Sequence, residues 1–99
     1  MPAAARLGDM CTGHGCWPPR PNVQGSPNVF INGKPAHRVG DAWAEHCCVV
    51  EDELLCHSSV LRSGSSSVFI NGKSAGRVGD AVYCGSSVAS GSADVFIGG

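Results

Sequence analysis

The chain repeats itself three times, and this repetition limits the folds it can adopt. Two short patterns, A-x-R-[LV]-G-D and G-S-x-x-V-F-I, alternate along the sequence. The first occurs at residues 4–9, 36–41 and 75–80, and the second at residues 25–31, 64–70 and 91–97. Three copies in a chain of 99 residues predict one small, pseudo-symmetric domain over residues 1–99.

The composition excludes some classes of function. The chain has 14 glycines and only 6% aromatic residues, so it is expected to fold through β-pairing and turns with the help of a staple. Its net charge is -1 and its Lys and Arg residues form no cluster. It therefore lacks the electrostatic footprint of a protein that binds nucleic acid or a membrane surface.

The sequence also predicts a compartment. No apolar run is long enough to span a bilayer, and residues 1–6 lack the apolar core of a secretory signal. The chain is therefore expected to be made in the cytoplasm. Its six cysteines would then be reduced when it folds, which favours metal binding over disulfides.

Two segments carry a strong β-hairpin signal. In residues 29–39, three β-formers run into Asn32-Gly33, a pair that tolerates the positive φ angles of a type I′ turn. Residues 68–78 repeat this pattern around Asn71-Gly72. Pro35 cannot donate to a strand ladder, so its side of the return strand is expected to be an edge or a bulge.

No segment shows helical periodicity, so the predicted fold class is all-β. Residues 43–46 and 49–55 are expected to form short turns. The third V-F-I has no return strand after it, and the first A-x-R-L-G-D has no outgoing strand before it. Residues 95–97 are therefore expected to pair with residues 4–8, which closes a ring of three hairpins and removes exposed sheet edges. The alternative is that both termini fray.

The loops between the repeats hold potential metal ligands at matching positions. His14 and His46 each lie five residues after the aspartate of the preceding repeat, and Cys84 lies four residues after it. His57 and Cys84 both lie seven residues before the next Gly-Ser. Three histidines and one cysteine match the tetrahedral preference of zinc. The predicted metal site is His14, His46, His57 and Cys84, although each histidine taken alone could be a solvated loop residue.

The other five cysteines leave alternatives open. They could replace a histidine in the site, or pack as small apolar groups. Some pairs could also oxidise once the protein leaves the cytoplasm. A second zinc held by four of them is a further alternative: Cys11, Cys16, Cys47 and Cys48. His37 lies in a return strand, where the other repeats have Ala5 and Gly76, and is expected to be a surface residue.

Other recurring or large side chains are expected to be structural. Each repeat has an arginine three residues before an aspartate, and the pair is expected to fix the corner between strand and loop. The pairs are Arg6 with Asp9, Arg38 with Asp41, and Arg77 with Asp80. Trp17 and Trp43 are expected to pack in the core.

These motifs resemble the PAAR-repeat family, which is named for Pro-Ala-Ala-Arg. The resemblance rests on Pro2–Arg6, Pro35–Arg38 and the V-F-I-N-G-K segments, and it covers essentially the whole chain. The third copy differs, with Ser74 for the proline and Gly76 for an alanine. Neither change is expected to disturb the fold.

The resemblance implies a small cone of β-hairpins with pseudo-three-fold symmetry. It implies a tip that caps the trimeric β-helical spike of a type VI secretion system or a contractile phage tail. One copy per spike trimer is expected, with a zinc near the vertex held by three histidines and one cysteine. On matching positions these are His14, His46, His57 and Cys84.

The implied role is mechanical rather than enzymatic: a sharp, zinc-stabilised point for piercing an outer membrane, with any effector or adaptor protein expected to be separate. The compact size favours a phage or prophage tail over a type VI secretion system.

Two alternative functions remain. A zinc hydrolase would need an open coordination position and a general base among Glu45, Glu51, Asp52 and Glu53. A small secreted binding module would be stabilised by disulfides instead.

Overall fold

The computed structural model describes all residues, 1–99, and it is all-β, as predicted. Three antiparallel two-stranded sheets follow one another along the chain. Their strands are β1 (Phe30–Ile31) with β2 (Lys34–Pro35), β3 (Ala42–Val50) with β4 (Glu53–Val60), and β5 (Phe69–Ile70) with β6 (Lys73–Ser74). The remaining backbone pairing consists of isolated bridges between segments that are distant in sequence. No helix is present that could cross a bilayer.

The two Asn-Gly hairpins form as predicted. Asn32 and Gly33 have φ angles of 55° and 75°, and Asn71 and Gly72 have 55° and 77°. Both central residues of a type I′ turn need a positive φ, which Asn and Gly adopt most readily. The return strands are shorter than predicted, since β2 ends at Pro35, which has no N–H to donate.

The chain after each return strand pairs with the other repeats and not with its own hairpin. Three backbone hydrogen bonds form a closed triangle at the middle of the A-x-R elements. Ala5 N–H donates to Gly76 O (2.9 Å), Gly76 N–H to His37 O (2.8 Å), and His37 N–H to Ala5 O (3.1 Å). This triangle marks the pseudo-three-fold axis.

The prediction that His37 is a surface residue was wrong. His37 is completely buried, and its imidazole lies edge-on to Trp43 with ring centroids 5.3 Å apart. Its Nδ1 atom lies 2.8 Å from Gln24 O, so the chain before the first hairpin and β3 both cover this position. At the matching position of the third repeat, Gly76 is constrained, because a Cβ there would lie 2.7 Å from the Leu61 side chain.

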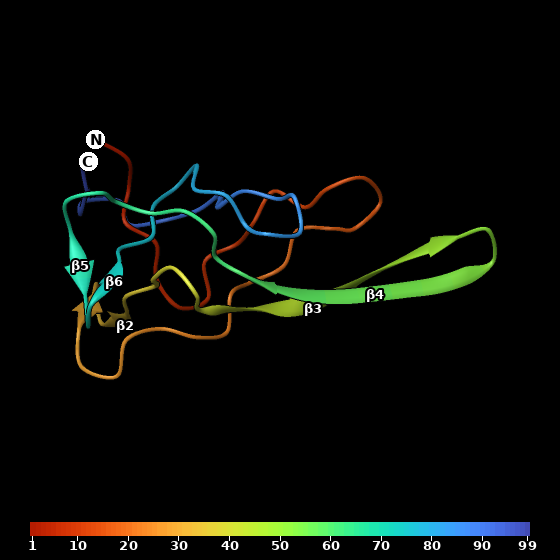
Figure 1. Ribbon diagram of the computed structural model, residues 1–99, viewed down its shortest axis with the longest axis horizontal. Coiled ribbons are helices and arrows are strands. Elements are labelled where there is room, and N and C mark those ends of the chain that lie inside the picture. Colours follow the sequence, from red (N-terminus) through yellow and green to blue (C-terminus); the bar gives the residue numbers. More distant parts are fainter.

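The two ends of the chain meet, as predicted (Figure 1). Ala3 bridges Phe96, Ala4 N–H donates to Val95 O (2.9 Å), and Ile97 N–H donates to Pro2 O (2.9 Å). Residues 95–97 thus pair with residues 2–4, closer to the N-terminus than the expected residues 4–8. This pairing completes the third unit from the two halves of one repeat.

Polar contacts between repeats follow the same symmetry. Each recurrent arginine binds the aspartate three residues on, with Nε–Oδ2 distances of 3.0, 2.8 and 3.1 Å, which confirms the predicted corners. The same arginines also reach the tip of a neighbouring hairpin. Arg6 donates to Asn32 Oδ1 and Arg38 to Asn71 Oδ1, whereas Arg77 donates to the carbonyl of Gly98. At the third position, a backbone oxygen near the C-terminus therefore replaces the asparagine side chain.

Two small apolar clusters make the core. The first takes one isoleucine and one alanine from each repeat: Ile31, Ile70, Ile97, Ala4, Ala36 and Ala75. The second lies beneath the loops and contains Trp43, as predicted, with Ala5, Cys11, Leu61, Val82 and Val88. The first cluster is symmetric, whereas the second is built mostly from residues that differ between repeats.

One long hairpin departs from the pseudo-symmetry. β3 and β4 project along the long axis of a molecule that measures 43 × 24 × 21 Å, away from the end that holds both termini (Figure 1). Residues 43–46 lie within β3, so the prediction of a short turn there was wrong, whereas residues 49–55 contain the turn between β3 and β4. The hairpin turns at Glu51 and Asp52, with φ angles of 50° and 65°. This turn gives no Asn-Gly signal in the sequence.

Candidate metal centre

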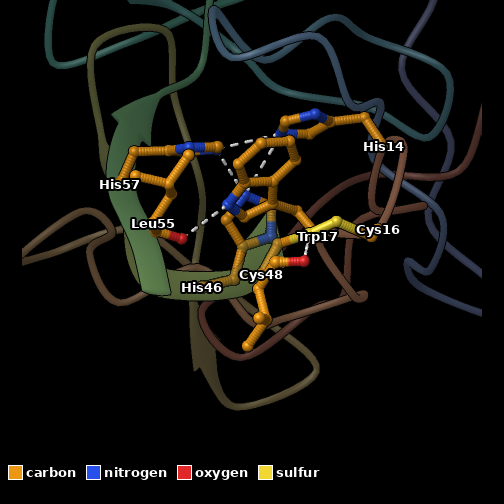
Figure 2. The surroundings of a disulfide bond; sticks show 8 residues. His14, Cys16, Trp17, His46, Cys48, Leu55 and His57 are labelled. Atoms are coloured by element: carbon orange, nitrogen blue, oxygen red, sulfur yellow. Dashed lines mark hydrogen bonds between the residues drawn. A yellow bond between two sulfur atoms is a disulfide. The ribbon is translucent and has the colours of Figure 1, made fainter. Parts of the chain in front are cut away.

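Three imidazole rings converge where the long hairpin leaves the body. The Nε2 atom of His14 lies 3.2 Å from that of His46 and 2.9 Å from that of His57, and the last two are 2.6 Å apart. With Cys84 Sγ, all four potential ligand atoms lie within 4.8 Å of one another. Figure 2 shows the three rings pointing towards one another. The four residues selected from the repeats are thus brought together.

The four potential ligands come from three parts of the chain. His46 and His57 are directly opposite each other on β3 and β4. His14 is in a tight loop that closes through reciprocal backbone hydrogen bonds with Trp17, of 3.0 and 2.9 Å. Cys84 is in the loop of the third repeat, where its N–H donates to Ser59 Oγ (3.1 Å).

The three short nitrogen–nitrogen contacts need a shared partner. Each Nε2 has one in-plane position, which holds either a hydrogen or a lone pair. Three such atoms cannot satisfy all three contacts with hydrogen bonds alone. The Nδ1 atom of His46 lies 2.8 Å from Pro18 O, and a neutral ring that donates this hydrogen presents a lone pair at Nε2. A cation between the rings would accept all three lone pairs, so the residues fit a metal.

The surroundings favour the ligand form of each group. Loss of solvation, with repulsion from neighbouring His46, lowers the pKa of His14 and of His57, so both rings stay neutral at neutral pH. Burial tends to raise the pKa of the Cys84 thiol, but hydrogen bonds from Ser86 and Arg20 outweigh it, and the net pKa is lowered. A neutral imidazole and a thiolate are the forms that bind a metal.

Arg20 and Trp17 surround the site, and neither role was predicted. The buried guanidinium of Arg20 donates to Cys11 Sγ (3.1 Å) and to Cys84 Sγ (3.5 Å). Trp17 stacks on His14 with ring centroids 5.2 Å apart, and its Nε1–H donates to Leu55 O (3.0 Å). Trp17 therefore covers the histidine cluster and is not a core residue. Neither residue has a counterpart in the other repeats, so the repeat pattern gave no signal for them.

Four of the six cysteines, which were expected to be reduced when the chain folds, are oxidised in this structure. Disulfides join Cys16 to Cys48 and Cys47 to Cys56, while Cys11 and Cys84 are free. The alternative zinc site on Cys11, Cys16, Cys47 and Cys48 is therefore excluded in this structure. The composition indicates the redox environment in which the chain folds, but only the fold brings these sulfurs within bonding distance. Glu45, Cys47 and Cys56 form a second group of potential ligands, but the disulfide uses both sulfurs.

Comparison with protein families matches the PAAR motif twice, over residues 2–51 and 52–99. The chain belongs to the PAAR-motif family. A comparison with curated proteins gave no match. Family membership supports a general role at the spike tip of a contractile injection machine, either a type VI secretion system or a phage tail. The structure also brings together residues of this chain that could hold a metal ion, which agrees with a metal-binding family.

Proposed function

We propose that this PAAR protein is a zinc-stabilised tip that caps the trimeric spike of a contractile injection machine, with one copy per trimer. The general role rests on the family. The single observation that carries the stoichiometry is the pseudo-three-fold face formed by the V-F-I segments. The phenylalanines in these segments, Phe30, Phe69 and Phe96, are 56%, 58% and 50% exposed.

This face suits a three-fold-symmetric partner. Each phenylalanine precedes an isoleucine that is nine-tenths buried in the symmetric cluster. Three large apolar groups are thus held in equivalent positions by one rigid core. A single chain can present the same contact to each subunit of a trimer, and burial of the phenylalanines would drive the association. Because the net charge is small, electrostatic attraction is expected to contribute little to the association.

The proposed ion is one zinc per chain, bound by His14, His46, His57 and Cys84. This donor set matches tetrahedral zinc and fills all four positions. Zinc binding contributes on the order of 10 kcal/mol to the stability of small zinc-dependent folds. That energy would tie together three loops that bury little apolar surface, and so help the tip to resist unfolding as it pierces the target outer membrane.

The remaining features follow from this role. Any effector or adaptor would bind as a separate protein, and contact with the target membrane would be transient. A zinc hydrolase needs an open coordination position, which a site with four protein ligands does not leave. The two disulfides favour one second candidate, a small secreted module that binds another partner. Whether the chain associates with the spike protein distinguishes this second candidate function from the role of a spike tip.

The test is to mix the purified chain with the spike protein of the same gene cluster and to measure the mass of the complex by light scattering. One copy per trimer is expected, with little dependence on salt. Phe69→Asp should abolish binding. Leu54→Asp changes a residue at the tip of the β3–β4 hairpin that is 65% exposed, and it should leave binding intact. Three copies per trimer, or no association, would overturn the proposal.

A further inference from the structure

The two disulfides join the same segments that carry the three histidines. Cys16 follows His14 by two residues, and its partner Cys48 follows His46 by two residues. Cys47 adjoins His46, and its partner Cys56 adjoins His57. The covalent connections therefore run from the His14 loop to β3 and from β3 to β4. Figure 2 shows the first of them beside the imidazoles.

The second disulfide fixes the relative position of two ligands. His46 pairs with His57 in the β3–β4 ladder, and the next pair along is Cys47 with Cys56. The Cα atoms of these cysteines are 4.1 Å apart. Neighbouring residues of a strand point to opposite faces, so the disulfide lies on the other face from the imidazoles. It can thus hold the register of the pair without occupying the metal site.

The first disulfide holds the third ligand. Apart from the contacts between the imidazoles themselves, the loop of residues 13–19 has two hydrogen bonds to β3 and β4. One runs from Trp17 Nε1 to Leu55 O and the other joins His46 Nδ1 and Pro18 O. A disulfide with its Cα atoms 5.5 Å apart adds a covalent connection from this loop to β3.

We propose that Cys16–Cys48 and Cys47–Cys56 position the three histidines and so control how firmly the metal is held. This inference rests on the proposed metal site. In the oxidised protein the disulfides hold the imidazoles in place before the ion binds. A site that is already ordered loses less conformational freedom on binding, so it holds the ion more firmly. In the reduced protein, the His14 loop and the hairpin move more independently, and the ion leaves faster. Metal retention therefore depends on the redox state of four cysteines that do not bind the metal.

The formation of each disulfide is a two-electron oxidation. Two thiols lose two protons and two electrons and form one sulfur–sulfur bond. The acceptor is a disulfide oxidant, such as oxidised glutathione or an oxidoreductase disulfide, which becomes two thiols. Oxidation would follow exposure of the chain to an oxidising compartment. Cys56 is exposed, so an oxidant or a reductant can reach this pair.

The experiment measures zinc release from the full chain into a chromogenic chelator, with and without a phosphine reductant. We expect release to be about 10-fold to 100-fold faster after reduction, the range typical of groups that orient metal ligands. The double variants Cys47→Ser/Cys56→Ser and Cys16→Ser/Cys48→Ser should release zinc faster without reductant. Val49→Ser/Leu54→Ser changes an exposed cross-strand pair of the same hairpin and should behave like the wild type. Circular dichroism checks that each variant folds, and reduction of the loaded wild-type protein tests the inference without any substitution.

Four results are possible, and they differ in what they say about the inference and about the metal site. Two thiols that can be alkylated in the oxidised protein after denaturation, six after reduction, and faster zinc release from the folded protein on reduction would support the inference. If one zinc is bound and its release rate is the same with and without the reductant, the inference is overturned while the proposed zinc site stands. A second zinc bound on reduction, through Glu45, Cys47 and Cys56, would also overturn it. No zinc in the oxidised wild-type protein would overturn the metal site itself.

Discussion

Ring closure makes a quantitative prediction about three isoleucines. Ile31, Ile70 and Ile97 are 9%, 8% and 8% exposed and belong to one cluster with three buried alanines. Replacing any one of them with alanine removes the same group from equivalent surroundings. If residues 95–97 are a full member of the ring, Ile97→Ala should destabilise the protein as much as Ile31→Ala or Ile70→Ala does.

The magnitude follows from the size and burial of the side chain. Isoleucine to alanine removes three carbons, and at about 0.8 kcal/mol for each buried carbon the lost transfer energy is about 2.4 kcal/mol. The cavity that remains adds to this cost, so about 3 kcal/mol is expected for each variant. In a domain of this size, that loss lowers the melting temperature by about 12 to 24 °C.

The assay is thermal and denaturant unfolding of the three single variants, followed by circular dichroism at matched zinc content. Phe96→Ala, which shortens a half-exposed neighbour of Ile97, serves as the control and should have a much smaller effect. Equal losses for the three isoleucines are expected. If Ile97→Ala cost less than about 0.5 kcal/mol while Ile31→Ala cost the expected amount, the C-terminal segment would be a tail, and ring closure would be refuted.

Further predictions concern the ends and the histidines. Deleting residues 95–99 should destabilise the whole domain, because residues 2–4 lose their pairing partner; unchanged melting would contradict this. His57→Ala should sharply lower the zinc content measured by elemental analysis, and equal zinc in both proteins would remove His57 from the site. His37→Ala should keep its zinc but lose about 2 kcal/mol or more of stability, because it empties a buried position. Burial lowers the pKa of His37 below its ordinary 6.5, so the unfolded chain binds an extra proton in acid. Stability should therefore fall as the pH drops below about 6.5, and His37→Ala should flatten this fall; equal slopes in a pH series of melting curves would count against it.

The sequence by itself determined the features that repeat. The two Asn-Gly turns depend on local backbone preferences, so their residues were sufficient to predict them. The unmatched halves of one repeat at opposite ends predicted that the termini meet. The matching offsets of His14, His46, His57 and Cys84 predicted which side chains converge, because equivalent loops of a symmetric body approach the same axis.

The tertiary structure decided the features that break the symmetry. His37 is buried because Trp43 and the backbone at Gln24 pack against it, and only the tertiary structure brings these segments together. The disulfide partners are 32 and 9 residues apart, and their pairing depends on where the His14 loop and β4 lie against β3. A signal for the long hairpin was present, since His46-Cys47 and Cys56-His57 are mirror images about Glu51-Asp52. That order becomes a ladder only if Glu51 and Asp52 adopt positive φ angles, which neither residue favours in isolation. Local preference therefore fixed the repeated units, and contacts between distant segments fixed the geometry around the proposed metal.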